Sequence, residues 1–398
     1  MSEWEETTLG ELINFTTGKL NSNAAVVDGE YPFFTCSPET LSIDTYAFDC
    51  KAILLAGNNA NGQYPIKIYS GKFNAYQRTY VITPKNDEEV DLDYLYYLLR
   101  IQLNYFKEIS QGSATKFLTV VILRNLSLEL PPLPVQKSIA AILSNLDRKI
   151  SNLRQQNETL ESIAQTLFKH WFVDFEFPNE DGKPYKSSGG AMVRSDLRDI
   201  PGGWEVGKLG DEIETLGGGT PSTTVSEYWE NGDILWYSPT DLTRSKTLFS
   251  LGSEKKITKI GLERSSAKLF SKYSLLLTSR ATIGEVTINT QDACTNQGFI
   301  TIIPNQVFSI YFLYGWLLTQ VNLIKQLASG STFPEISKST FRDFPFLKPD
   351  VEILIRYDQT VKPIFQKIET NTKQIQTLTQ TRDRLLPKLM SGQLRIPE

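Results

Sequence analysis

The stretch from Val135 to Phe172, VQKSIAAILSNLDRKISNLRQQNETLESIAQTLFKHWF, organises this chain. Apolar residues recur along it in alternating steps of four and three, which places them on one seam of a helix, as in a coiled coil. No Gly or Pro interrupts the stretch, so it predicts one long helix. Asn157 is a polar member of the seam that can fix the register at some cost in stability. The other seam residues are Ile139, Leu143, Leu146, Ile150, Leu153, Leu160, Ala164, Leu167 and Trp171.

A second stretch with the same repeat runs from Val351 to Met390. Pro363 and Pro387 depart from the pattern, and each is expected to kink the helix or to mark its first or last turn. Either helix alone could belong to the core of an ordinary domain, but two such helices in one chain favour a coiled coil. The seam of the second helix holds Tyr357, Val361, Ile364, Ile368, Asn371, Ile375, Leu378, Arg382, Leu385 and Leu389.

The regions before the two helices repeat each other, and internal repetition has to be settled before a fold is inferred. The opening residues Trp4, Leu9 and Gly10 recur as Trp204, Leu209 and Gly210. The order is therefore globular domain, helix, globular domain, helix. Three further segments recur: LLAGNNANGQY (54–64) as LLTSRATIGEV (276–286), AYQRTYVI (75–82) as TNQGFITI (295–302), and QGSATKFL (111–118) as ASGSTFPEI (328–336).

Each globular half mixes short strands with helices, which predicts an α+β fold. Runs rich in β-branched and aromatic residues predict strands, and helices with apolar faces are expected at Leu92–Leu103 and Ile310–Gln326. The polar segment 178–199 predicts an exposed connector. The expected strands are Ala52–Leu55, Ile66–Tyr69, Tyr80–Thr83, Leu275–Thr278, Glu285–Ile288 and Phe299–Ile303.

The length, charge and composition of the chain exclude several classes of protein. The chain has 398 residues, which suits two or three domains, and its net charge of −4 gives no global basic signature. No apolar run approaches the ~18 residues of a membrane span, and the acidic start MSEWEETTLG is unlike a signal peptide. Three scattered cysteines indicate free thiols in a reducing cytosol, so we expect a cytoplasmic protein. With one histidine, they predict no zinc site.

An enzyme is the competing class, but no catalytic constellation is assembled. Leu130-Pro131-Pro132-Leu133 lacks the amide or carboxylate of an adenine methyltransferase loop. The glycines of Gly217–Thr220 lack the lysine of a P-loop. They favour a flexible turn, although a backbone nest at a DNA phosphate stays open. The sole histidine, His170, favours packing over general-base chemistry. We therefore predict no catalytic residue.

Several segments resemble type I restriction–modification specificity (S) subunits, and the resemblance covers essentially the whole chain. It implies a non-catalytic subunit whose two target-recognition domains bind double-stranded DNA and whose helices dock methyltransferase (M) and restriction (R) subunits. S-adenosylmethionine, ATP and Mg would belong to those partners, and this chain would hold no cofactor. The segments are LFKHWFVDFEFPNEDGKPYKSSGGAMV (167–193), IPGGWEVGKLGD (200–211), ILWYSPTDL (234–242), LLLTSRATIGEV (275–286), ACTNQGF (293–299) and LLPKLMSGQL (385–394).

The predicted fold joins two similar α+β target-recognition domains by two long antiparallel coiled-coil helices with pseudo-two-fold (circular) symmetry, by analogy with isologous dimers. A helix of about 38 residues spans roughly 57 Å. Two target-recognition domains held that far apart predict a DNA target in two parts that are separated by a fixed number of base pairs. The expected parts are domain one at 1–133, a helix at 134–173, a connector at 174–200, domain two at 201–349, a helix at 350–391 and a tail at 392–398.

Loops between strands are the expected place for DNA contacts, because bases are read best by Arg, Lys, Asn and Gln and phosphates by Arg, Lys, Ser, Thr and Tyr. Any one candidate could instead be a solvated turn or a capped strand end. The candidates in domain one are Asn58, Asn59, Asn61, Gln63, Tyr64, Tyr76, Gln77, Arg78 and Lys116. Those in domain two are Thr220, Trp236, Tyr237, Asp241, Ser279, Arg280, Thr282, Asn296, Gln297, Ser331, Thr332 and Lys338.

Two other hypotheses remain. Both domains could bind proteins, which would make the chain an adaptor without DNA affinity. Alternatively, the acidic balance makes it plausible that the isolated subunit binds DNA weakly and gains affinity only beside a more basic partner.

Overall fold

The computed structural model describes residues 4–60, 62–110, 115–328 and 334–396. The chain divides into two compact units. The first unit combines Met1–Ile150 with Thr377–Glu398, and the second unit is Ser151–Gln376. Both ends of the chain therefore belong to the first unit. Within it, Trp4 lies close to Gly392, where an added Cβ would lie 3.1 Å from Cζ2 of the Trp4 ring.

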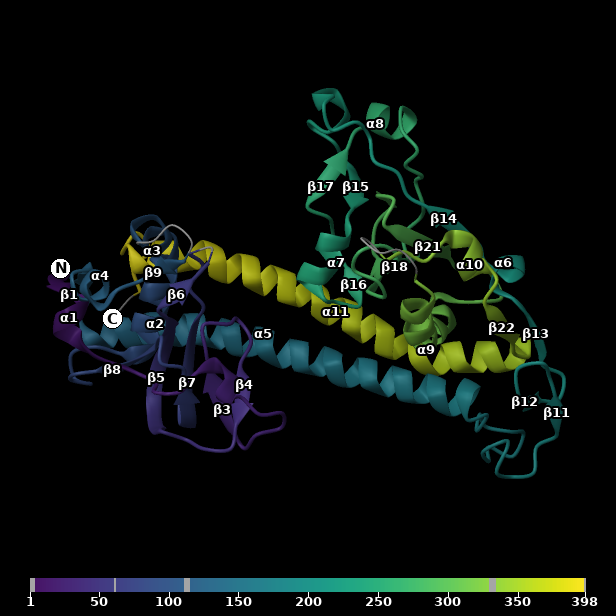
Figure 1. Cartoon of the computed structure of the whole chain (residues 1–398), viewed down its shortest axis with the longest axis horizontal. Coiled ribbons are helices and arrows are strands. Elements are labelled where there is room, and N and C mark those ends of the chain that lie inside the picture. Colours follow the sequence, from purple (N-terminus) through teal and green to yellow (C-terminus); the bar gives the residue numbers. More distant parts are fainter. Residues whose placement is uncertain (1–3, 61, 111–114, 329–333, 397–398) are drawn as a thin grey trace. The chain divides into compact units, whose positions relative to one another are not determined.

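A six-stranded sheet forms the centre of the first unit (Figure 1). Neighbouring strands are antiparallel except for β3 and β7, which run parallel. The strands β5, β7 and β8 were predicted from sequence, although all three are longer than expected. In sheet order the strands are β2 (Ile13–Thr17), β8 (Thr79–Pro84), β5 (Phe48–Ala56), β7 (Ile66–Ala75), β3 (Tyr31–Phe34) and β4 (Leu41–Ile43).

Strand β5 contains a continuous apolar run because the sheet is covered on both faces. Successive side chains of a strand point to opposite faces. Ile53 and Leu55 accordingly belong to one apolar cluster, and Ala52 and Leu54 belong to another. Such a run is typical of a strand that is buried on both sides.

Helix α2 starts at an N-cap in which the Asp91 carboxylate accepts a hydrogen bond from the Tyr94 backbone N–H at 2.9 Å. Its buried face, which includes Tyr94, Leu95 and Leu99, covers the sheet. The helices of the first unit before the long one are α1 (Leu9–Leu12), the 3-10 turn Ser22–Ala24, α2 (Leu92–Ile101), α3 (Leu103–Ile109) and α4 (Val120–Arg124). Two small ladders complete it: β1 (Glu5–Thr8) with β10 (Ser127–Leu130), and β6 (Asn58–Asn59) with β9 (Lys116–Phe117).

The second unit holds a five-stranded and a three-stranded sheet (Figure 1). The larger has the order β14 (Glu214–Gly217), β21 (Phe299–Ile303), β18 (Leu275–Thr278), β19 (Val286–Asn289), β16 (Phe249–Ser250). The smaller has the order β17 (Lys255–Ile257), β15 (Ile234–Tyr237), β20 (Ala293–Thr295). Two further pairs are β11 (Met192–Arg194) with β12 (Asp199–Pro201), and β13 (Glu205–Lys208) with β22 (Pro345–Lys348).

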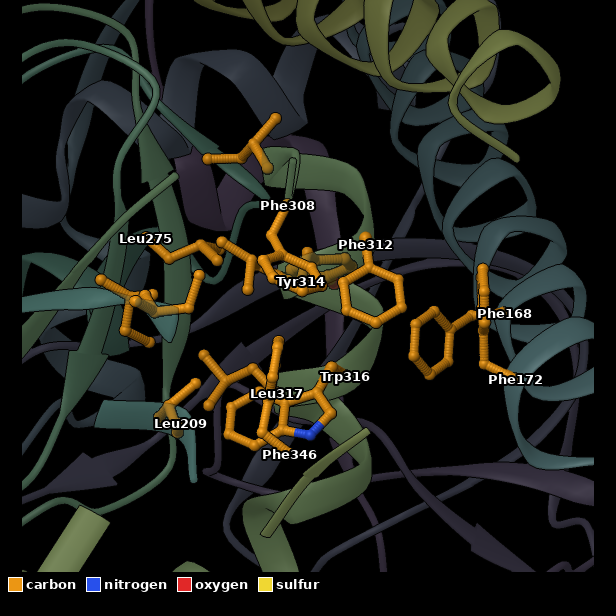
Figure 2. Packing of buried hydrophobic residues seen from close by; sticks show 14 of the residues in the cluster. Phe168, Phe172, Leu209, Leu275, Phe308, Phe312, Tyr314, Trp316, Leu317 and Phe346 are labelled. Carbon is orange, nitrogen blue, oxygen red and sulfur yellow. The ribbon is translucent and has the colours of Figure 1, made fainter. Parts of the chain in front are cut away.

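The principal helix of the second unit is α9, which matches the predicted helix closely and starts at the N-cap Ser309. Figure 2 shows its aromatic side chains packed in the core with Phe168 and Phe172. The ring centroids of Phe172 and Phe312 are 4.9 Å apart. A side chain at Gly315 would overlap the Phe168 ring, so this glycine allows the close packing. The helices are α6 (Leu209–Glu212), the 3-10 turn Ser226–Tyr228, α7 (Pro239–Ser245), α8 (Lys259–Glu263), α9 (Ile310–Leu327) and α10 (Lys338–Arg342).

The duplication predicted from sequence recurs in the local structure of both units. The ladder β1–β10 corresponds to β13–β22, and in each case a one-turn helix follows the first strand. Gly10 in α1 lies against Arg124, and Gly210 in α6 lies against Arg342. The side chain of Arg342 donates to the Gly210 carbonyl. The α+β class with two similar domains is therefore confirmed.

Both long helices are present, as α5 (Leu133–Phe168) and α11 (Val351–Met390). α5 continues as a π-helical turn at Lys169–Val173. α11 runs through Pro363, and Pro387 lies in its last turn. No helix in the described ranges combines the length and the hydropathy needed to cross a bilayer.

The two helices pair in opposite directions within each unit. In the first unit, Ile139 and Leu143 near the start of α5 share a cluster with Leu386 and Leu389 near the end of α11. In the second unit, Trp171 just beyond α5 packs on Tyr357 near the start of α11, with ring centroids 5.6 Å apart. The beginning of each helix therefore meets the end of the other, as the predicted antiparallel arrangement requires.

The polar seam position predicted at Asn157 has a polar partner in the second unit. Asn371 Nδ2 donates to Asn157 Oδ1 at 2.9 Å, and Asn157 Nδ2 donates to Thr372 Oγ1 at 3.3 Å. Asn371 is fully buried. Since polar groups inside an apolar seam are best satisfied in one alignment, this layer favours a single register.

The segment 178–199 is mostly exposed, as predicted, but it is folded rather than extended. It contains β11, which pairs with β12 at its end, and Tyr185 stacks on Phe177 with centroids 4.6 Å apart. Phe177 in turn stacks on Trp204. These aromatic contacts hold a polar segment in place, which composition alone did not reveal.

Candidate nucleic-acid interface

In the first unit, a turn between β7 and β8 presents Gln77. The backbone N–H of Gln77 donates to the Leu20 carbonyl at 2.9 Å, and its side-chain Nε2 donates to Asn21 Oδ1 at 2.7 Å. The segment that carries Leu20 and Asn21 reaches the turn because Gly18 has no side chain, since a Cβ there would overlap the Ala75 carbonyl. The amide of Gln77 is therefore held in one orientation at an exposed turn.

The second unit holds Gln297 in the corresponding way. Thr220 Oγ1 donates to Gln297 Oε1 at 2.6 Å. The Gly219 backbone N–H donates to the Thr295 carbonyl at 2.8 Å, and a Cβ on Gly218 would overlap the Asn296 carbonyl. These glycines pack against the end of β20 and form a turn that is fixed by contacts, whereas the sequence favoured a flexible turn. We call the two features the glutamine turns, Tyr76–Arg78 and Asn296–Gly298.

Each glutamine turn is hydrogen-bonded to the loop that follows a central strand. The Gly57 N–H, after β5, donates to the Arg78 carbonyl at 2.8 Å, and the Ser279 N–H, after β18, donates to the Gly298 carbonyl at 2.8 Å. The loops 57–65 and 279–285 therefore start beside the turns. The two repeats differ in sequence within these loops while the frame around them is shared.

Around the first loop, most candidates are partly or fully exposed. Asn58 Oδ1 accepts from the Cys36 thiol at 3.0 Å, and Arg78 lies over the Phe117 ring, 5.4 Å from its centroid. Lys116 lies in β9 opposite Asn59 of β6. Gln63 is exposed, and Tyr76 is half-buried beside Leu20. The loop thus carries amides, and the cations Arg78 and Lys116 come from the glutamine turn and from β9 beside it.

Around the second loop, Arg280 is partly neutralised. Its Nε lies 3.7 Å from Glu335 Oε2, and both side chains are about half exposed. Thr282 is exposed on the same loop. Lys338 is exposed at the start of α10, where Ser337 is the N-cap. The Asn296 side chain is bound within its turn and accepts from the Gly298 N–H at 2.9 Å.

Several predicted site residues belong to the framework instead of the surface. Tyr64 is 2% exposed and Tyr237 is 0% exposed, and burial raises the pKa of Tyr237 to about 12. Trp236 is buried and donates to the Gly219 carbonyl at 2.9 Å. Ser279 is buried in the strand end. These residues can position the exposed loops without touching a ligand themselves.

Asp241 also has a structural position. Its Oδ2 accepts from the backbone and the hydroxyl of Ser238, which caps α7, and its Oδ1 accepts from the Glu254 N–H at 2.7 Å. Asn61, Ser331 and Thr332 lie outside the described residues. In the described part of the chain, no group of three or more His, Cys, Asp or Glu could hold a metal ion.

Some residues around the glutamine turns and loops come from elsewhere in the chain and were not predicted from sequence. Asn21 and Phe117 contact Gln77 and Arg78, and Lys107 and Lys325 lie against the two loops. Asn21 has no sequence signal beyond its place after Gly18. The two lysines could have been found from the repeat, because each precedes a Gly-Ser pair at the same spacing, Gly112 and Gly330.

Comparison with known proteins identifies the family. The model of the type I restriction modification DNA specificity domain matches residues 1–162 and 201–381. The chain belongs to this family. The MjaIX specificity subunit of Methanocaldococcus jannaschii is 33% identical over 327 residues, or 80% of this chain and 72% of the relative. The EcoDI specificity subunit of Escherichia coli is 27% identical over 416 residues, or 98% of this chain and 89% of the relative.

The fold of this specificity-domain protein is also that of a solved relative. An S subunit of a type I restriction–modification system from M. genitalium matches with a TM-score of 0.65 at 17% identity, covering 97% of this chain and 96% of that chain. The curated relatives are named as specificity subunits, not as catalytic subunits. The family predicted from sequence is therefore confirmed, and with it a specificity subunit rather than an enzyme.

Proposed function

We propose that this specificity subunit reads a split, asymmetric DNA target, with one half bound by each unit. The observation that carries the proposal is the duplicated glutamine turn beside a loop whose sequence differs between the two units. Gln77 and Gln297 are each held by a side chain from the segment after the first sheet strand. A glutamine amide can pair with the edge of adenine in the major groove through two hydrogen bonds. Different loops on a common frame suit two different half-sites.

The exposed candidates divide by chemistry into base readers and backbone contacts. In the first unit, the amides of Asn58, Gln63 and Gln77 suit base edges, while Arg78 and Lys116 suit either a guanine edge or a phosphate. In the second unit, Gln297 and Arg280 suit base edges, and Thr220, Thr282 and Lys338 suit phosphates. The buried tyrosines and Asp241 would then keep the loops in position.

We further propose that the long helices dock methyltransferase and restriction subunits, which would bring S-adenosylmethionine, ATP and Mg, in the cytoplasm. Exposed apolar side chains on both helices support a docking role. Ile142 and Ile163 on α5, and Val351 and Ile355 on α11, are all well exposed. Val351 and Ile355 lie one helical turn apart, and neighbouring exposed apolar side chains suit a protein–protein contact.

Methylome sequencing tests the proposal directly. A strain that carries this chain with its methyltransferase partner should show methylation at a motif in two parts with a fixed gap. A second assay measures binding of the purified complex to duplexes with and without that motif. Modification without any split motif, or equal binding to all duplexes, would reject DNA reading and favour the protein-binding adaptor.

A further inference from the structure

Each unit contains a loop glycine with a positive φ that lies against a lysine side chain. Gly62, in the loop after β5, has φ 66°, and Gly284, in the loop after β18, has φ 93°. A Cβ built on Gly62 would lie 3.1 Å from Lys107 Cγ, and one on Gly284 would lie 2.9 Å from Lys325 Cε. Both the backbone conformation and the close approach favour glycine. The two units therefore share this contact although their loop sequences differ.

The two lysines occupy equivalent places on helices of different construction. Lys107 lies in α3, the second of two short helices, and Lys325 lies near the end of the single long helix α9. Each stands the same number of residues after the start of its helical segment, Leu92 or Ile310. A lysine near a helix C-terminus is favoured by the helix dipole. That effect explains a cation there, but not its contact with the recognition loop in both units.

Neither lysine is neutralised within the part of the chain that the structure describes. Both are exposed, and neither forms an ion pair with a described carboxylate. Arg280, on the second loop, is by contrast paired with Glu335. In the first unit, Lys116 also approaches Gly62, with its Cγ 3.5 Å from an added Cβ. A lysine that packs against the loop glycine and has no ion-pair partner among the described carboxylates is thus the feature common to both units.

We propose that Lys107 and Lys325 each bind a phosphate of the DNA backbone and so orient the neighbouring glutamine turn toward the base edges. This inference rests on the proposed function, and it names the sequence-independent contact of each half-site. A lysine ammonium neutralises a phosphate and releases its condensed counterion but carries no base information. The missing side chain at Gly62 and Gly284 lets each lysine lie directly against the backbone of its loop.

The test is the salt dependence of DNA binding by the full chain in complex with its methyltransferase partner. The probes are a duplex with the methylated motif and a scrambled duplex of equal length. For the double variant Lys107→Ala/Lys325→Ala, the slope of log K against log salt should become shallower by about 1.8, roughly 0.9 for each lost contact. Affinity at 0.15 M salt should fall about fivefold for each lysine on both duplexes.

Matched variants separate phosphate binding by the two lysines from a general effect of charge and from a purely structural role. The double variant Lys186→Ala/Arg194→Ala removes the same charge from two exposed positions in the connector and should keep the wild-type slope. Lys107→Arg/Lys325→Arg should restore the slope. If the alanine variant melts at a lower temperature but keeps the wild-type slope, the lysines serve only their helices and the inference is overturned. If the wild-type complex itself binds no duplex selectively, the proposed function fails instead.

Discussion

Arg382 of α11 donates from Nη1 to Oδ1 of Asp147 on α5 across 2.5 Å. Tyr97 of α2 donates to the other carboxylate oxygen at 2.7 Å. Arg382 occupies a seam position that is otherwise apolar, and its side chain is only 11% exposed. Asp147 therefore compensates a cation inside the helix pair and ties the pair to the helix that covers the first sheet.

Asp147→Ala should lower the free energy of unfolding by about 1–3 kcal/mol, because Arg382 and Tyr97 would lose their acceptor in a largely buried place. Urea unfolding followed by circular dichroism measures the change. Asp383→Ala is the control, since it removes a more exposed carboxylate that also accepts from Arg382, and it should cost about 0.5 kcal/mol or less. Equal losses in the two variants would contradict the assigned role of Asp147.

The polar layer at Asn157 and Asn371 should lower the stability of the fold while it fixes the register of α5 against α11. Asn371 Oδ1 has no hydrogen-bond partner among the described residues. Asn157→Leu/Asn371→Leu should therefore raise the thermal midpoint, because one buried and one half-buried amide are replaced by apolar packing. Asn371→Leu alone should lower it, because Asn157 would lose a partner. Calorimetry measures the thermal midpoint of both variants relative to the wild type. A lower midpoint for the double variant would refute the prediction.

Gln77→Ala and Gln297→Ala should each relax specificity in one half of the target only. Loss of a bidentate base contact costs about 1–3 kcal/mol of discrimination. Methylome sequencing of each variant should show degenerate bases in one half of the motif and an unchanged other half. Gln155→Ala, at an exposed position on α5, is the control and should leave the motif intact. Degeneracy in both halves from either single variant would show that the units do not read separately.

Neighbouring glycines should respond differently to the same substitution. Gly218→Ala places a Cβ against the Asn296 carbonyl and should displace the segment that holds Gln297. Nothing lies within 4 Å of a Cβ at Gly217, so Gly217→Ala should change stability by no more than about 0.5 kcal/mol. Thermal unfolding and target binding of both variants test this. Equal behaviour of the two variants would mean that the close approach at Gly218 is not required.

Stability of the second unit should fall as pH rises above the ordinary pKa of glutamate. Burial raises the pKa of Glu161 above its usual 4.5, and the Tyr314 hydroxyl that donates to it at 3.1 Å opposes this only in part. The folded chain thus holds this proton more tightly than the unfolded chain. Stability is lost between pH 4.5 and the raised pKa and is constant above it.

Glu161→Gln removes this ionisation, so its stability relative to the wild type should increase across the same pH window. Urea midpoints measured between pH 4 and pH 8, at about one-unit steps, give the difference. Glu180→Gln, at an exposed position, provides the comparison and should follow the wild-type curve. A Glu161→Gln variant that loses stability relative to the wild type as pH rises would contradict the assignment.

Sequence periodicity was sufficient for the parts of the fold that depend on local pattern. The seam residues Ile139 and Leu143 are buried as predicted, and the glutamine turns were found because the repeat aligns Gln77 with Gln297. Tyr64 could not be assigned to the core, because an amphipathic side chain at a loop boundary suits either environment.

The positions of the remaining residues depend on contacts between segments that lie far apart in the sequence. Asn21 reaches Gln77 only because Gly18 lets two segments meet, and no local pattern encodes that contact. The partner of Arg382 was equally hidden, since Asp147 lies far away in the chain and the helices had to be aligned first.

The first unit takes its core from both ends of the chain, because Leu386 and Leu389 of α11 cover Ile139 and Leu143. On the ribosome, the sheet and the start of α5 emerge early, yet Ile139 and Leu143 of α5 stay uncovered until the final helix has been translated. The half that is synthesised first is thus the last to finish folding. A nascent chain arrested before Thr377 would contain a complete second unit and an incompletely folded first unit with exposed apolar residues. Aggregation is therefore most favoured late in translation.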